Sequence, residues 1–136
     1  MNHHDVNTLS ALVFQFFKGL DTRDHRTTAQ FMARDGLWKR QGVDFVGPDA
    51  VLATLEARDP TRRTAHLINN LWVAESTATT VQLRYYVTAF ESVVAADGKV
   101  GPTQIAGILD STDDLVLEDG QWRIQHKSTQ RVLAAG

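Results

Sequence analysis

The sequence has 136 residues, of which 43% are hydrophobic and 22% are charged; its formal net charge is −2 at pH 7 and it contains no cysteine. This length and composition suit one folded domain over residues 1–136, because disorder requires low hydrophobicity and high net charge. The weak negative charge argues against nucleic acid as a partner, and the absence of cysteine excludes disulfides, thiolate nucleophiles and zinc–thiolate sites.

The first half of the chain is predicted to be mainly helical. Apolar residues recur at three- and four-residue steps from Asp5 to Leu20, which indicates an amphipathic helix. Asp24 is a plausible N-cap for a second helix, and Asp35-Gly36 is interpreted as a turn. The further elements predicted in this half are a helix over 25–33, strands over 37–41 and 43–46, and a helix over 50–58 that ends at Asp59-Pro60.

The second half is predicted to be a meander of long antiparallel strands. Its segments are rich in β-branched and aromatic residues, and turn signals such as Asp97-Gly98 and Asp119-Gly120 separate them. The four strands are expected over residues 63–74, 77–94, 104–118 and 121–133. Helices followed by strands indicate the α+β class. A curved, mostly antiparallel sheet with the N-terminal helices packed across it would enclose a pocket for a small-molecule ligand.

Three groups of polar residues are candidates for a site in that pocket. Strand alternation would place His66, Ile68, Asn70 and Trp72 on one face, although a lone histidine is more often a structural residue. Arg84 and Tyr86 share a polar face that could contact a substrate or be simply solvated. Asp21 follows the first helix, where an acidic residue is usually a cap or turn residue.

Metals and cofactors are not expected. The body of the chain has no metal-ligand spacing of histidines and carboxylates, no glycine-rich phosphate loop and no Gly-x-Ser-x-Gly turn. The pair His3-His4 is interpreted as part of a terminal tail rather than as a metal site. The N-terminus does not resemble a signal peptide and no apolar run is long enough to span a bilayer, so we expect a cytoplasmic protein that does not bind membranes.

Five segments in order resemble the SnoaL-like branch of the NTF2-like superfamily, over nearly the whole chain. The segments are Leu20-Asp21-Thr22-Arg23-Asp24, Leu37-Trp38, Gly47-Pro48-Asp49-Ala50-Val51, Thr64-Ala65-His66-Leu67-Ile68-Asn69-Asn70 and Asp119-Gly120-Gln121-Trp122-Arg123-Ile124. That branch includes scytalone dehydratase, hexachlorocyclohexane dehydrochlorinase, polyketide cyclases and the small subunits of ring-hydroxylating dioxygenases. The resemblance implies the cone-shaped, cystatin-like fold of the superfamily.

The resemblance also implies a general-base dyad. In the dehydratase and dehydrochlorinase, an aspartate after the first helix orients a histidine that removes a proton from carbon, and the matching positions are Asp21 and His66. The chain would then be a lyase or isomerase for a small apolar substrate that can be cyclic. The further residues expected at the substrate are Trp38, Asn70, Trp72, Arg84 and Tyr86.

The chain departs from the family pattern in two places. No tyrosine near Asp21 matches the pocket tyrosines of scytalone dehydratase, and Ser111 stands where an aromatic residue is often found on the third long strand. An alternative is therefore a non-catalytic small-molecule-binding protein, or an accessory subunit like that of the dioxygenases. Because an open curved sheet leaves one broad face uncovered, we also expect a homodimer.

Overall fold

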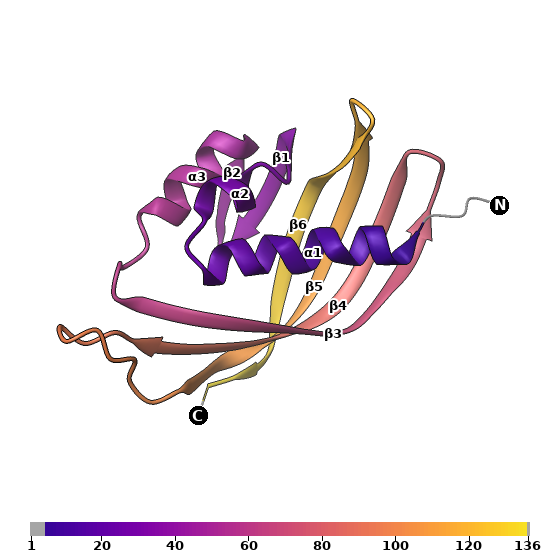
Figure 1. Ribbon diagram of the computed structural model, residues 1–136. Coiled ribbons are helices and arrows are strands. Elements are labelled where there is room, and N and C mark those ends of the chain that lie inside the picture. Colours follow the sequence, from indigo (N-terminus) through magenta and orange to yellow (C-terminus); the bar gives the residue numbers. More distant parts are fainter. Residues whose placement is uncertain (1–4, 136) are drawn as a thin grey trace.

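The computed structural model describes residues 5–135, which form six strands and three helices (Figure 1). All six strands belong to one curved sheet in the order β2-β1-β6-β5-β4-β3, antiparallel except for the β1–β6 pair. The helices are α1 (Val6–Asp21), α2 (His25–Ala29) and α3 (Gly47–Glu56), and the strands are β1 (Met32–Arg40), β2 (Val43–Val46), β3 (Arg62–Ser76), β4 (Thr80–Val93), β5 (Gln104–Glu118) and β6 (Gln121–Ala134). None of the helices described is long and apolar enough to cross a membrane.

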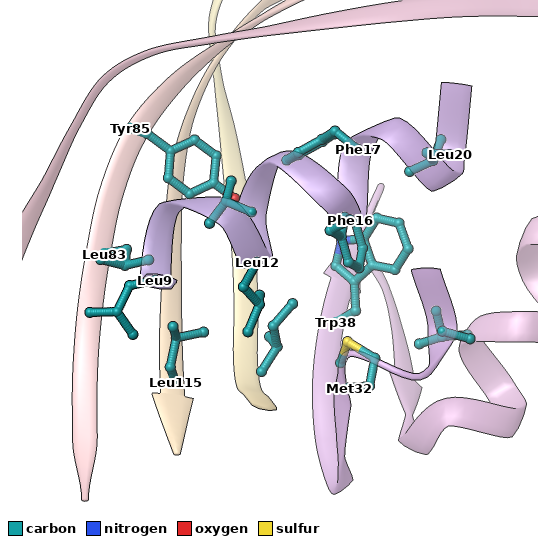
Figure 2. Packing of buried hydrophobic residues seen from close by; sticks show 14 of the residues in the cluster. Leu9, Leu12, Phe16, Phe17, Leu20, Met32, Trp38, Leu83, Tyr85 and Leu115 are labelled. Carbon is teal, nitrogen blue, oxygen red and sulfur yellow. The ribbon is translucent and has the colours of Figure 1, made fainter. Parts of the chain in front are cut away.

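Helix α1 lies across the concave face of the sheet (Figure 1). Asp5 caps it, accepting a hydrogen bond from the backbone N–H of Asn7 at 2.9 Å. Its apolar stripe then packs on residues of β1, β4 and β5; Figure 2 shows Phe16 beside Trp38 of β1, and Leu9 near Leu83 of β4 and Leu115 of β5. Burying one large apolar side chain of this kind contributes about 1.5–3 kcal/mol, so this layer fixes the position of α1 and of the residues at its C-terminal end.

The predicted α+β class and the meander of four long strands are confirmed. The predicted second helix is too long, because α2 ends at Ala29 and β1 already begins at Met32. The predicted turn at Asp35-Gly36 is wrong. These residues lie inside β1, where the pairing with β6 shifts register, and a Cβ on Gly36 would collide with the carbonyl oxygen of Ile124.

Two further register shifts decide which side chains face the helices. In β3 the pairing with β4 shifts between Asn69 and Trp72, and Asn70 has a left-handed φ of 56°, which asparagine tolerates better than most residues. In β6 the pairing with β5 skips Gln125. Because side chains alternate with a period of two, each extra residue moves the residues after it to the opposite face of the sheet.

Candidate active site

The corner between α1 and α2 brings Asp21 to the edge of the sheet. Gly19 allows this tight corner, since a Cβ there would collide with the buried hydroxyl of Thr28 on α2. Arg23 stabilises this corner by donating hydrogen bonds to the carbonyl oxygens of Arg58 and Arg62. Asp21 is the last residue of α1, where the helix dipole disfavours a carboxylate. A role other than stabilising the helix is therefore indicated for this side chain.

Asp21 and His66 are in direct contact. Oδ1 of Asp21 lies 2.6 Å from Nδ1 of His66, and Oδ2 accepts the backbone N–H of His66 at 2.9 Å. The hydroxyl of Thr64 donates a further hydrogen bond to Oδ1 at 2.9 Å. The side chains of His66 and Asp21 are only 12% and 17% exposed, so both groups are largely withdrawn from water.

These contacts favour the ionised form of Asp21. Burial alone would raise the pKa of the Asp21 carboxyl, but the hydrogen bonds and charge of His66, with the hydroxyl of Thr64, outweigh it and lower the pKa below its usual value of 3.8. An ionised carboxylate only accepts hydrogen bonds, so Nδ1 of His66 carries the proton of this contact; in the neutral imidazole the lone pair then lies on Nε2. Within residues 5–135, Nε2 has no hydrogen-bond partner.

His66 also forms part of the wall of a cavity of about 160 Å³ on the concave face of the sheet. The lining residues are Phe17, Leu20, Trp38, Arg40, Gln41, Arg58, Arg62, His66, Ala89, Ala106, Gly107, Leu109, Lys127, Thr129 and Arg131. Asp21 instead lines a separate hollow beside α1, so the imidazole lies between the carboxylate and the cavity. The ring of Phe17 packs against the imidazole of His66, with 5.1 Å between the ring centroids.

Of the other residues predicted to contact a substrate, one lines the cavity and four lie on the outer face of the sheet. Trp38 is 6% exposed and lines the cavity. Asn70 and Trp72 do not share the face of His66, because the bulge at Asn70 turns both to the outside and leaves Trp72 54% exposed. Arg84 and Tyr86 also lie on the outer face, where Arg84 pairs with Asp110 at 3.4 Å.

A second group of buried polar side chains includes Lys127 of the cavity wall. Nζ of Lys127 is 3.1 Å from Oδ1 of Asp113 and 2.8 Å from the hydroxyl of Tyr85, which itself donates to Asp113 at 2.7 Å. All three side chains are almost completely buried, and the ammonium group lies 4.4 Å from the ring centroid of Phe16. Neither Asp113 nor Lys127 was predicted from the sequence to have a role of this kind.

The cavity is more polar than the predicted small apolar substrate would require, because four arginines line it. Arg40, Arg58, Arg62 and Arg131 come from separate parts of the chain, so no local sequence pattern marks them. After its bulge, β6 turns Lys127, Thr129 and Arg131 inward together. This alternation is the one sequence signal that could have indicated Arg131.

The metal and cofactor predictions remain untested. Over residues 5–135 there is no cluster of histidine, cysteine, aspartate and glutamate that could hold a metal ion. His3 and His4 lie outside the described residues.

The chain matches a known domain profile in sequence and several solved proteins in structure. The profile of the SnoaL-like domain matches residues 3–128. A search of curated proteins gave no significant match. A point variant of Rv3472, a protein of unknown function from Mycobacterium tuberculosis, superimposes with a TM-score of 0.78 at 23% identity, over 93% of this chain and 70% of that one.

Two further solved structures have the same architecture. Aln2 from a Streptomyces species has a TM-score of 0.75 at 22% identity, over 93% of this chain and 89% of that one. A type 2 hexachlorocyclohexane dehydrochlorinase has a TM-score of 0.78 at 19% identity, over 93% of this chain and 84% of that one. At these identities the structural similarity establishes a shared fold, whereas the sequence profile spans most of the chain.

Proposed function

The chain belongs to the SnoaL-like domain family, and on this premise we propose that it is a cofactor-independent lyase or isomerase for a small substrate with a largely apolar, ring-shaped body. The observation that carries this proposal is the 2.6 Å contact between Asp21 and His66 at the wall of a cavity. One structural neighbour is named for a dehydrochlorination, which is an elimination. That name agrees with the proposed reaction class.

His66 would act as the general base. Asp21 holds the proton on Nδ1, and Nε2 removes a proton from a substrate carbon. The electron pair of the broken C–H bond forms a double bond, and in an elimination the leaving group departs with its own electron pair. In an isomerisation the imidazolium returns the proton to a different carbon. The charge of Asp21 stabilises the imidazolium in either case.

The apolar part of the cavity would hold the body of the substrate. Phe17 presents apolar surface beside His66, Leu109 adds apolar surface to the cavity wall, and Trp38 forms the side that belongs to β1. Rings of this kind bind flat, apolar substrates through a large contact area. Trp38 thus keeps its predicted role as a substrate contact, whereas Asn70, Trp72, Arg84 and Tyr86 are not included.

Hydrogen exchange with solvent tests this proposal directly. Ring ketones with an acidic C–H bond, incubated with the protein in D₂O, are expected to gain deuterium at that carbon, because a base that removes the proton exchanges it with solvent. Proton NMR follows the loss of the C–H signal, and heat-denatured protein gives the background rate. Ligands that raise the melting temperature but do not exchange would favour the alternative, a binding protein without catalysis.

The homodimer remains a proposal. It is supported by apolar side chains on the outer sheet face, where Leu67 is 53%, Trp72 54% and Tyr86 41% exposed. Sedimentation equilibrium is expected to give twice the mass of the chain, and Trp72→Glu to reduce it toward the monomer mass. A wild-type monomer at all concentrations would contradict this, and copurification with a larger protein would favour the accessory-subunit alternative. The cytoplasmic location stays a prediction from the sequence.

A further inference from the structure

The cavity beside His66 concentrates positive charge in a chain whose overall charge is negative. Four arginines line it, although the formal net charge of the protein is −2. Arg40 ends β1, Arg58 follows α3, Arg62 begins β3 and Arg131 lies near the end of β6. Bringing like charges together opposes folding, so this convergence indicates a ligand of opposite charge.

Most of this charge is not neutralised by the protein. Arg62 pairs with Glu91 at 3.0 Å, and the buried Lys127 pairs with Asp113. The other three arginines form no ion pair with a carboxylate in the part of the chain that the structure describes, although Asp21 attracts Arg58 from a longer distance. Their contacts are the Trp38 ring for Arg40, the carbonyl oxygen of Ala106 for Arg131, and the carbonyl oxygen of Leu20 with the hydroxyl of Thr64 for Arg58.

Arg58 is deeply buried, and its charge is therefore the most costly of the three unpaired arginines. It is 9% exposed, and its buried Nε has no hydrogen-bond partner. Burial, together with repulsion from Arg62, Arg40 and Arg23, outweighs the attraction of Asp21 and lowers the pKa of Arg58 to about 10, so that it is still charged at neutral pH. Burial and Arg62 also lower the pKa of Arg40. A buried charge without an ion-pair partner is costly, and an anion in the cavity would reduce that cost.

The backbone of β5 leaves room for the side chain of Arg131, one of these four arginines. Gly107 on β5 has a φ of 152°, and a Cβ there would collide with Nη1 of Arg131. The guanidinium of Arg131 can therefore lie against the backbone of β5, where it donates to the carbonyl oxygen of Ala106 and lines the cavity. Guanidinium groups suit carboxylates in particular, because two parallel N–H donors match the two carboxylate oxygens.

We propose that the substrate of this cavity carries a carboxylate, held by Arg40, Arg58 and Arg131, while its apolar body lies against Phe17 and Trp38 with the reacting carbon at His66. The position of the reacting carbon rests on the proposed function, whereas the anion site does not. A cavity of about 160 Å³ with aromatic walls selects a small organic acid over a nucleotide or other large polyanion.

Calorimetric titration with three simple probes tests the anion site without any turnover. Benzoate supplies a carboxylate and an apolar ring, benzamide has the same shape without charge, and inorganic phosphate is an anion without a ring. At constant ionic strength, benzoate is expected to bind at least about tenfold more tightly than benzamide, given the strength of charged hydrogen bonds. Equal binding of benzoate and benzamide, or binding of phosphate alone, would overturn the proposal.

Matched charge variants identify the residues responsible. Arg40→Gln and Arg131→Gln are each expected to weaken benzoate binding about tenfold and to leave benzamide binding unchanged. Arg84→Gln removes the same charge from the outer face and is expected to have no effect. Melting temperatures without ligand show that each variant folds, and unchanged benzoate affinity in both folded cavity variants would refute the site.

The same variants separate this inference from the proposed function. Arginine-dependent benzoate binding without proton exchange on any carboxylate-bearing ketone would leave the anion site standing and remove the catalytic proposal. Exchange on neutral ketones at a rate that Arg40→Gln and Arg131→Gln do not change would leave the catalytic proposal standing and remove the anion site.

Discussion

Replacing His66 with alanine is expected to lower the rate of proton exchange and of turnover by about 10²–10⁴-fold, the usual contribution of a positioned general base. Nε2 of His66 is the one nitrogen of the ring left without a partner, among the residues described, once Asp21 has accepted Nδ1–H. Alanine removes that lone pair but leaves the apolar part of the cavity wall in place. Rates measured by NMR on a ring ketone, with ligand binding measured separately, check this prediction.

Asp21→Asn should reduce the rate as well, because an amide has the shape of the carboxylate but not its charge. Asp21 stabilises the imidazolium through a charged hydrogen bond that asparagine does not reproduce. Since the two residues act as one unit, the double variant is expected to lose little more activity than His66→Ala alone. Additive losses would mean that the two side chains act separately.

The outer face of the sheet offers a matched control for these variants. Nδ1 of His126 lies 4.0 Å from Asp114, in a histidine–aspartate pair that is 35% and 43% exposed. His126→Ala removes a histidine of the same kind from outside the cavity, and turnover is expected to stay at the wild-type level. Activity that survives in His66→Ala, or that falls equally in His126→Ala, would contradict the assignment of His66 as the base.

The order of elements was predictable from the sequence because it depends on local signals. The apolar stripe of α1, with its spacing of three and four residues, and turn signals such as Asp119-Gly120 each act over a few residues. The pairing of Asp21 with His66 depends on residues 45 positions apart. It could be expected only because the chain resembles the SnoaL-like family, since neither residue is distinctive by itself.

It was harder to predict which side chains of each strand point toward the cavity, because bulges interrupt the alternation. Alternation from His66 correctly places Ile68 inward but fails at Asn70, where one extra residue enters the ladder and turns Trp72 outward. The same kind of bulge at Gln125 turns Lys127 and Arg131 inward. The position of a bulge depends on how two strands pair, and the sequence of either strand alone marks it only weakly. The arginines of the cavity could therefore not be predicted from the sequence.

The pair formed by Asp113 and Lys127 is expected to dominate the effect of single substitutions on stability. Asp113→Asn keeps the shape of the side chain but leaves the ammonium group of Lys127 without a counter-ion in a site where Lys127 is 1% exposed. Breaking a buried pair in this way costs about 3–5 kcal/mol. Urea unfolding followed by circular dichroism measures the loss of unfolding free energy.

An exposed pair on the same sheet provides the comparison. Asp110→Asn breaks the contact with Arg84, whose side chain is 43% exposed, and is expected to change the unfolding free energy by no more than about 1 kcal/mol. Replacing both buried partners, as in Asp113→Leu with Lys127→Met, should restore much of the stability, because no buried charge is then left unpaired. Equal losses of unfolding free energy in Asp110→Asn and Asp113→Asn would show that the buried pair contributes no more to stability than the exposed one.

The stability of Asp113→Asn should also depend on pH in a direction that the structure determines. Burial lowers the pKa of Lys127 even with Asp113 present, and removing that carboxylate takes away the interaction that opposes the shift. The unfolded chain, with an ordinary lysine, then binds more protons than the folded one, so unfolding free energy rises with pH while Lys127 loses its proton. As the pH rises toward the ordinary pKa of lysine, about 10.4, the deficit of Asp113→Asn relative to the wild type should therefore shrink. A deficit that stays constant or grows over this range would mean that the lost stability does not come from an unpaired buried ammonium group.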